Sequence, residues 1–243
     1  MDLKGKTALV TGGGIRLGRA VALALAEEGA NLVIHYNSSQ EPAEETAQEA
    51  REMGVDAITA EANFDDPNVV QDLFPQALNH FASVDILINN AAIYLRGKGL
   101  ETDLETWEKE FRINLQAPFI LIQDFARQLP QDHNGRILNI ADAQVIQHRP
   151  DHFAYRLTKS ALVEMTRQFA IELAPRITVN AFAPGIMMPV SGKSEADLQA
   201  YTEKHVPLKR SGSPEIAAQN AMHLIKSDFT TGAILRVDGG QYL

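Results

Sequence analysis

A tyrosine and a lysine stand four residues apart in the stretch AYRLTKSAL, as Tyr155 and Lys159. On a helix, residues with this spacing lie on one face, one turn from each other. An ammonium close to a phenol favours the phenolate, so Lys159 is predicted to lower the pKa of Tyr155. A phenol tuned in this way can donate or accept a proton near neutral pH. The same spacing is also common on helices that carry one half-buried tyrosine and one surface lysine.

A carboxyl group, Asp142, ends the apolar run RILNIAD thirteen residues before the tyrosine. An ionised carboxylate only accepts hydrogen bonds, so it would repel the oxyanion that develops when a ketone is reduced. It suits a substrate that presents N–H groups, or one with a ring nitrogen that must be protonated. A carboxyl group shielded from water could carry that proton itself. The alternative is an aspartate that caps the strand end and accepts hydrogen bonds from backbone N–H groups.

Short β-branched runs alternate with amphipathic segments along the chain. The runs are KTALVTG, ANLVIHY, DAITAEA, VDILINN, GRILNIA, RITVNAF and AILRVDG. Near-continuous apolar strands are typical of a parallel sheet that is covered on both faces. We therefore expect an α/β protein with a single Rossmann-fold domain over residues 1–243, built on a doubly wound seven-stranded parallel sheet with helices on both faces. Ligands of such sheets bind at the carboxyl ends of the strands.

Four helices are predicted between these strands. LGRAVALALAEEG and EPAEETAQEAREMG each close on a glycine, where a left-handed C-cap belongs. WEKEFRINLQAPFILIQDFARQL and HFAYRLTKSALVEMTRQFAIELA are longer and largely apolar, so they pack either in the core or against a partner subunit. The polar segment 186–213 follows a strand and is long for a connection, so it is predicted to be a substrate lid.

The composition argues against several classes of protein. The chain has 243 residues, of which 45% are hydrophobic, and this size suits one large domain. No run of 18 apolar residues occurs and the opening MDLKGKTALV leads straight into a strand, so neither a membrane span nor a signal peptide is expected. A net charge of -9 without a basic run argues against nucleic acid as a partner. The chain has no cysteine and its histidines lack metal-ligand spacing, which predicts a reducing compartment and no metal site.

A glycine-rich turn follows the first predicted strand and leads directly into a helix. It reads Thr11-Gly12-Gly13-Gly14-Ile15-Arg16-Leu17-Gly18. Glycines let the backbone approach a pyrophosphate, and the helix N-terminus supplies free N–H groups and the positive end of a dipole. This turn, in this position, predicts dinucleotide binding.

The residues after the next strands indicate which dinucleotide is bound. The second strand ends in Tyr36-Asn37-Ser38-Ser39 and lacks the acidic residue that binds the adenine ribose in NAD-preferring folds. The amide and hydroxyl groups can bond a 2′-phosphate and Arg16 adds a cation nearby, so NADP(H) is predicted, although an ordinary loop would look similar. Asn63 could bind the adenine amino group or merely cap its own loop. Asn90 and Ala91 could let the cofactor pass or form a turn.

Taken together, these motifs resemble the short-chain dehydrogenase/reductase family. The glycine turn, Asn90-Ala91, Asn114, Tyr155-x-x-x-Lys159 and Pro184-Gly185 occur in the family's order and spacing, and the resemblance extends to the terminal VDGG. Arg16 replaces the central glycine of the turn and Asp142 replaces the usual catalytic serine. These departures and the HYNSS strand end resemble the pteridine reductase branch, which reduces dihydropterins or dihydrofolate with NADPH.

The resemblance implies a role for particular residues. Tyr155, Lys159, Asp142 and Asn114 would be catalytic; Asn114 would hold a water behind Lys159, or else bond within a helix kink. Arg16, Tyr94, Asp142 and Tyr155 would contact the pterin, with Tyr94 stacked on it. The implied cofactor contacts are Gly12, Arg16, Leu17, Gly18, Tyr36, Asn37, Ser38, Ser39, Asn63, Phe64, Asn90, Ala91, Ala92, Tyr155, Lys159, Pro184, Gly185 and Ile186.

The resemblance further implies a cytoplasmic homotetramer that acts on a small molecule. Two positions depart from the pteridine branch: Ala92 stands where a serine is common, and Ser38 stands where an arginine is frequent. The alternatives are a general short-chain carbonyl reductase and a non-catalytic NADP-binding sensor. The intact set of Tyr155, Lys159 and Asn114 argues against the sensor, which needs none of them.

Overall fold

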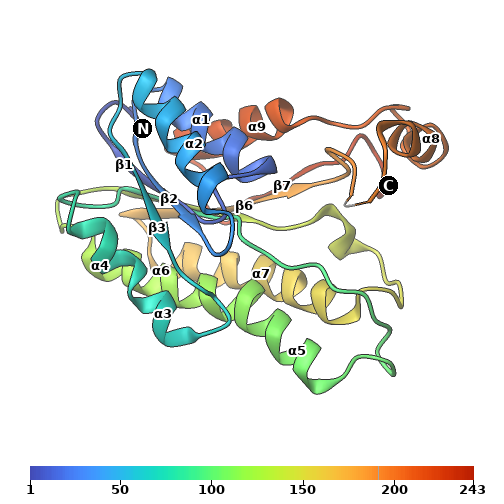
Figure 1. The fold of residues 1–243 in the computed structure, drawn as a ribbon. Coiled ribbons are helices and arrows are strands. Elements are labelled where there is room, and N and C mark those ends of the chain that lie inside the picture. Colours follow the sequence, from blue (N-terminus) through green and yellow to red (C-terminus); the bar gives the residue numbers. More distant parts are fainter. Residues whose placement is uncertain (191) are drawn as a thin grey trace.

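A single parallel sheet forms the centre of the molecule (Figure 1). The computed structural model describes residues 1–190 and 192–243. The strands are β1 (Thr7–Val10), β2 (Asn31–Tyr36), β3 (Ala57–Glu61), β4 (Ile86–Asn89), β5 (Gly135–Ile140), β6 (Ile177–Pro184) and β7 (Ile234–Val237). They pair in parallel in the order β3-β2-β1-β4-β5-β6-β7. The predicted doubly wound, seven-stranded parallel sheet is confirmed.

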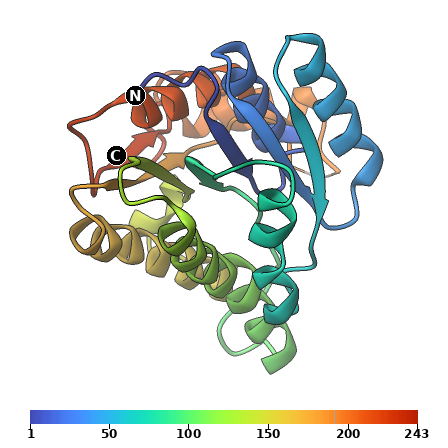
Figure 2. The same cartoon turned by 90° about the vertical axis from the view of Figure 1, so that its left-hand side faces the viewer.

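Helices cover both faces of the sheet (Figure 1, Figure 2). One face carries α1 (Arg16–Glu27), α2 (Gln40–Glu52) and α9 (Pro214–Lys226); the other carries α3 (Pro67–Gln71), α4 (Leu73–Leu78), α5 (Leu104–Phe111), α6 (Ala117–Gln128) and α7 (Phe153–Glu172). In β1, Ala8 and Val10 pack under the first layer, whereas Leu9 packs under the second. Both faces of the strand are therefore buried, which explains why its sequence is apolar throughout.

The long helix predicted over WEKEFRINLQAPFILIQDFARQL is interrupted near its middle. Helix α5 ends at Phe111, a π-helical turn η1 (Arg112–Gln116) follows, and α6 begins at Ala117. Such turns insert an extra residue and often occur at functional sites. Asn114 lies in this turn, where its amide group bonds both the N–H and the carbonyl of Ile93.

The predicted lid contains a helix that the sequence reading did not specify. Helix α8 (Glu195–His205) begins with a capping box between Ser194 and Asp197. It lies near the C-terminus, at the carboxyl-end side of the sheet (Figure 1). Gln241 fixes the tail to this region, because its Nε2 donates to the hydroxyl of Tyr201 at 3.1 Å. Among the described residues, no helix is both long enough and apolar enough to span a bilayer.

Candidate active site

The glycine loop is closely packed against the end of β4. A Cβ atom on Gly18 would lie 2.1 Å from the carbonyl oxygen of Gly12 and 2.5 Å from Nδ2 of Asn90, so only glycine fits there. Asn90 Nδ2 donates to the carbonyl oxygens of Thr11 at 2.8 Å and Gly12 at 3.2 Å. Asn90 therefore braces the loop, which is a structural role. Its contact with the cofactor stays a prediction.

His35 is a second brace of the glycine loop. Its side chain is buried, and its Nδ1 accepts from the Gly12 N–H at 3.1 Å. Its Nε2 then carries the proton and donates to the carbonyl of Ala62 at 2.9 Å. The ring stacks on Phe64 with centroids 4.1 Å apart. Burial lowers the pKa of His35 to about 4, so this bonding pattern persists at neutral pH.

The lowered pKa of His35 makes folding stability depend on pH. Between pH 6.5 and 4 the unfolded chain binds one more proton at this residue than the folded chain does, so stability falls as the pH falls. The expected loss between pH 7 and pH 5 is about 2 kcal/mol. Urea unfolding at both pH values would measure it. His35→Gln cannot titrate and should lose less stability over this interval; an equal loss would show that His35 does not titrate as stated.

The other residues that were predicted to contact the adenine end of the cofactor lie around the ends of β2 and β3, away from Tyr155 and Asp142. Asn37 and Ser38 are exposed, and Ser39 precedes α2. Asn63 Oδ1 accepts from the Asp65 N–H at 3.0 Å, which is the loop-capping arrangement. Among the described residues, no side chain caps the first turn of α1, which leaves this helix N-terminus open to an anion.

Asp142 and Tyr155 form a direct hydrogen bond at the carboxyl end of β5. The Tyr155 hydroxyl donates to Oδ2 of Asp142 at 2.9 Å. The same carboxylate caps a short 3-10 helix, η2 (Ala143–Ile146), because its Oδ1 accepts from the Gln144 N–H at 2.8 Å. Oδ1 thus accepts a backbone N–H, as the capping interpretation expects, while Oδ2 contacts Tyr155, and a catalytic role of Asp142 stays a prediction.

The predicted lowering of the Tyr155 pKa by Lys159 is wrong for this structure. Burial and the adjacent Asp142 carboxylate raise the pKa of Tyr155 well above its usual value. Burial lowers the pKa of Lys159 to about 8, and its Nζ lies 5.9 Å from the centre of the Tyr155 ring. The spacing on the helix is as predicted, but desolvation and a carboxylate from another element outweigh the cation. Tyr155 thus stays protonated as a donor at neutral pH.

Lys159 and Asn114 lie behind Tyr155 and outside the open cleft. Lys159 is 3% exposed and its Nζ donates to the carbonyl of Ile140 at 2.7 Å. Asn114 Nδ2 lies 3.4 Å from Oγ1 of Thr158, next to Lys159 on α7. The structure therefore places both side chains on the buried side of the tyrosine, and their catalytic roles stay predictions.

A cleft of about 710 Å³ opens in front of the Tyr155–Asp142 pair. It brings together eight of the predicted site residues: Arg16, Leu17, Tyr94, Asp142, Tyr155, Pro184, Gly185 and Ile186. Arg16 reaches from the glycine loop to the lid, where its NH2 donates to the carbonyl of Pro189 at 3.1 Å. Residues that the sequence reading missed also line it, among them Gln144, Arg149, Arg156, Gln241 and Tyr242.

Gln144 and Arg156 hold the loop that carries Asp142. Gln144 Nε2 donates to Oδ2 of Asp142 at 2.7 Å, beside the tyrosine. Arg156 NH1 donates to the carbonyl of Gln144 at 3.1 Å, and its NH2 pairs with Asp151 at 3.2 Å. In the sequence, only its place two residues after Asp142 could have indicated that Gln144 belongs to the site. Nothing in the sequence indicated Arg156.

Tyr94 forms part of an aromatic wall of the cleft. Its ring stacks on His152 with centroids 3.8 Å apart and meets the Tyr155 ring edge-on at 4.6 Å. His152 adopts a left-handed conformation with φ 50, and its Nδ1 bonds the carbonyl of Leu95 at 2.7 Å. One face of Tyr94 is thus covered, so a ligand can stack only on the other.

The cleft lies between a glycine-rich turn and a tyrosine with a buried lysine behind it, at the edge of a doubly wound sheet. Comparison with known proteins shows which family has this arrangement. A family model described as enoyl-(acyl carrier protein) reductase matches residues 14–241. The chain belongs to the short-chain dehydrogenase/reductase family.

Individual relatives carry different activities. The 3-oxoacyl-[acyl-carrier-protein] reductase FabG of Staphylococcus epidermidis is 33% identical over 242 residues, covering 98% of this chain and 99% of the relative. A short-chain type dehydrogenase/reductase of Picea abies is 34% identical and covers 98% of this chain and 93% of its own length. The crystal structure of FolM alternative dihydrofolate reductase 1 from Brucella canis complexed with NADP has a TM-score of 0.92 and 32% identity, covering 99% and 96% of the two chains.

Proposed function

We propose that this protein is an NADPH-dependent oxidoreductase that reduces a pteridine of the dihydropterin or dihydrofolate type. The observation that carries this proposal is the hydrogen bond from Tyr155 to the Asp142 carboxylate in a cleft that Arg16 and Tyr94 also line. A serine at position 142 would suit a ketone, whereas the carboxylate accepts N–H groups, which pterins present. The similarity to an alternative dihydrofolate reductase supports the same substrate class.

The glycine loop and the open start of α1 fit NADP(H). Gly12 adopts φ 60 and Gly14 has no room for a Cβ, since that atom would lie 2.8 Å from the backbone of Ala43. Glycine at position 14 is thus needed for the packing of the loop against α2, and the N-terminus of α1 presents free N–H groups to a pyrophosphate. The similar FolM structure contains NADP, which agrees with the cofactor predicted from the second strand.

In the proposed reaction, the chain's own residues position the substrate and move a proton. Bound NADPH supplies the hydride. Tyr155 is protonated, because burial and Asp142 raise its pKa, and it donates toward the substrate atom that gains negative charge. Asp142 accepts from substrate N–H groups and from Tyr155, and Tyr94 offers its open face for stacking. Lys159 holds its charge close behind the phenol and orients the nicotinamide ribose.

A 3-oxoacyl reductase is the second candidate, because the FabG relatives and the matching family model both act on acyl-carrier-protein substrates by description. Assays that follow NADPH absorbance with dihydrobiopterin, dihydrofolate and a 3-oxoacyl thioester separate the two candidates. Turnover of the dihydropterins with NADPH preferred over NADH supports the proposal. Turnover of the thioester alone would overturn it.

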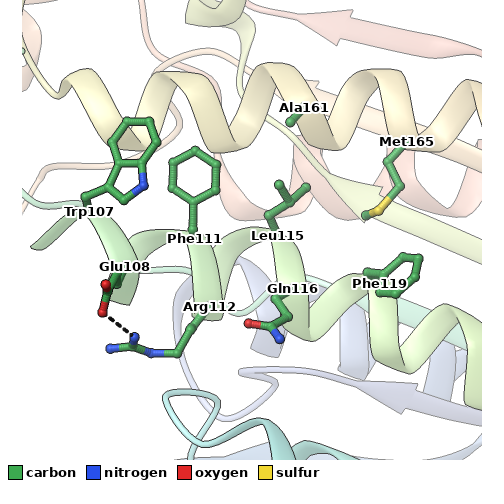
Figure 3. A pocket seen from close by; sticks show the side chains of 9 residues that line it. All are labelled: Trp107, Glu108, Phe111, Arg112, Leu115, Gln116, Phe119, Ala161 and Met165. Atoms are coloured by element: carbon green, nitrogen blue, oxygen red, sulfur yellow. Dashed lines mark hydrogen bonds and ion pairs between the residues drawn. The ribbon is translucent and has the colours of Figure 1, made fainter. Parts of the chain in front are cut away.

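We also propose that the protein is a homotetramer and that one of its interfaces is an apolar groove between α5–η1–α6 and α7 (Figure 3). Trp107, Phe111, Leu115 and Phe119 repeat every four residues and form one stripe. Figure 3 shows this stripe facing Ala161 and Met165 of α7, with the Glu108–Arg112 ion pair at its rim. Phe119 is 41% exposed, and burying such surface between copies would stabilise an assembly.

Leu115→Asp should shift the sedimentation coefficient from a tetramer toward smaller species, because a carboxylate in this groove opposes burial. Leu78→Asp on α4 is the matched control and should leave the assembly intact. A wild-type monomer at micromolar concentration would contradict the proposal.

Two further parts of the proposal concern the lid and the location. The lid 186–213 supplies Met187, Leu198 and Tyr201 to the wall of the cleft, so we propose that it closes over substrate. Substrate should then slow proteolytic cleavage within this segment; unchanged cleavage would argue against closure.

A cytoplasmic location agrees with the absence of cysteine from the sequence, and recovery of the enzyme in another cell fraction would refute it.

A further inference from the structure

Three side chains meet at a corner of the cleft that the proposed reaction does not use. Tyr201 comes from α8 in the lid, and Gln241 and Tyr242 come from the C-terminal tail; all three line the cleft in front of Tyr155. Gln241 Nε2 donates to the hydroxyl oxygen of Tyr201 at 3.1 Å and to that of Tyr242 at 3.2 Å. One amide group thus holds two phenols that come from different segments of the chain.

A third hydrogen bond fixes the direction of these two. The Ile186 N–H donates to Oε1 of Gln241 at 3.2 Å, and a backbone N–H can only donate. The amide oxygen therefore faces Ile186, and the Nε2 group, with its two hydrogens, faces Tyr201 and Tyr242. Each phenol oxygen is the acceptor in its bond with Gln241, so each keeps its own hydrogen for another partner. Among the described residues, neither hydroxyl donates a hydrogen bond.

The tail that carries Tyr242 is held firmly against the cleft. The Tyr242 N–H donates to Oδ2 of Asp238 at 3.2 Å, and its carbonyl oxygen accepts from Nη1 of Arg236 at 3.1 Å. A Cβ atom on Gly185, which also lines the cleft, would lie 2.6 Å from Cα of Asp238. Burial and the charge of Asp142 raise the pKa of Tyr242, so its phenol keeps its hydrogen at neutral pH.

The two hydroxyl groups bond the same nitrogen, so they lie close enough for one carbonyl or carboxylate group to accept from both. We propose that Tyr201 and Tyr242 form a two-donor subsite that binds an oxygen acceptor of the substrate. Gln241 is the positioning residue of this subsite, because its amide leaves the hydrogens of both phenols free to face a ligand. This inference rests on the proposed function and adds to it a contact that acts on substrate binding.

Tyr201→Phe and Tyr242→Phe test the subsite, because each removes one hydroxyl group and keeps the ring. Each variant should raise the KM for the pteridine by about 3- to 10-fold, which is the usual effect of one hydrogen bond. The double variant should raise it further. The kcat should change by less than about two-fold, because Tyr155 and Asp142 are untouched. Steady-state kinetics with NADPH would measure both constants.

Gln241→Glu reverses two hydrogen bonds and keeps the shape of the side chain. One carboxylate oxygen still accepts from the Ile186 N–H, whereas the other accepts from Tyr201 and Tyr242, which then have no hydrogen left for the substrate. We expect uncharged dihydrobiopterin to bind at least as weakly to this variant as to either phenylalanine variant. If Gln241 served the fold alone, this change would be tolerated, since the same side chains remain bonded.

The source of the oxygen acceptor is decided by comparing two substrates. Dihydrobiopterin offers a ring carbonyl, and dihydrofolate adds carboxylates at the end of its tail. Weaker binding of both compounds to the double phenylalanine variant would assign the ring carbonyl, and weaker binding of dihydrofolate alone would assign a carboxylate; either result supports the subsite. Unchanged binding of both compounds would overturn it.

Leu243→Ala is the matched control for the tail. Leu243 follows Tyr242 directly, but it is 92% exposed and lies outside the described wall of the cleft and outside the apolar groove between α5–η1–α6 and α7. Its replacement should leave the binding of both pteridines unchanged. An effect equal to that of Tyr242→Phe would show that any change in the tail weakens binding, and this result would also overturn the proposal.

Equilibrium binding separates this inference from the proposed function. Dissociation constants for both pteridines are measured on the complex with NADP, which carries no hydride to transfer. If the wild-type protein oxidises no NADPH with either compound, the proposed function fails, and the dissociation constants of the variants still decide whether the subsite exists. Binding of neither compound to the wild-type complex would overturn both proposals.

Discussion

Replacement of Tyr155 with phenylalanine is expected to lower kcat for reduction by about 10³-fold, while NADPH still binds. Among the described residues, the phenol is the only proton donor placed against Asp142 besides the Gln144 N–H and amide groups, which do not release protons. Phenylalanine keeps the ring and therefore its edge-on packing against Tyr94. Steady-state kinetics with dihydrobiopterin and fluorescence titration with NADPH would measure the two effects separately.

The pH dependence of the wild-type enzyme provides the control for this variant. Because the pKa of Tyr155 is raised well above its usual value, the phenol remains protonated through the neutral range. Ionisation of Tyr155 should therefore not limit the rate of reduction between pH 6 and 9. If Tyr155→Phe retained more than about a tenth of the wild-type kcat, another group would be the donor.

Asp142→Ser is expected to have the second-largest effect, a fall of about 100-fold in pterin reduction. Serine can still accept the Gln144 N–H and cap η2, because serine is a good N-cap residue. The substitution therefore removes the carboxylate that faces Tyr155 and leaves the local fold in place. The loss of the negative charge should also lower the pKa of Tyr155. The measurement is kcat/KM for dihydrobiopterin beside that for a simple ketone.

The two substrates give opposite expected results in the Asp142→Ser enzyme. Ketone reduction should hold steady or rise, since a hydroxyl can donate to the developing oxyanion whereas a carboxylate repels it. Asp142→Asn is a second variant of similar shape and should also lose pterin reduction. An unchanged pterin rate in both variants would mean that Asp142 is a cap alone, and the proposed substrate class would then have no basis in this site.

Local patterns predicted those features that depend on neighbours in the chain. The seven strands follow from apolar runs, because a parallel sheet buries both faces of each strand. The spacing of Tyr155 and Lys159 places them on one side of α7, as predicted. The motif residues at the carboxyl ends of β1, β5 and β6 meet in one cleft, because parallel strands all end at the same edge of the sheet.

Helix continuity was harder to predict. One long helix was predicted where α5, η1 and α6 lie, with a kink at Asn114 as an alternative, and nothing in the periodicity of WEKEFRINLQAPF marks a π-helical turn. Within the turn, the Asn114 side chain bonds the backbone of Ile93, which lies 21 residues away in the chain, so the sequence around Asn114 does not reveal this contact. The same limit applies to Glu110, which is 1% exposed and accepts a hydrogen bond from the N–H of Leu95, 15 residues away.

From its residues alone, the chain specifies its seven strands, its glycine loop and the side chains that can carry out a reduction, because strand periodicity and short motifs act over neighbouring residues. Only the folded structure decides how those side chains behave. The pKa of Tyr155 rises instead of falling because burial and the carboxylate of Asp142, two residues after β5, outweigh the lysine one turn away. His35 braces Gly12, and Asp142 divides its oxygens between a cap and a phenol, because both depend on partners that only the tertiary fold brings near.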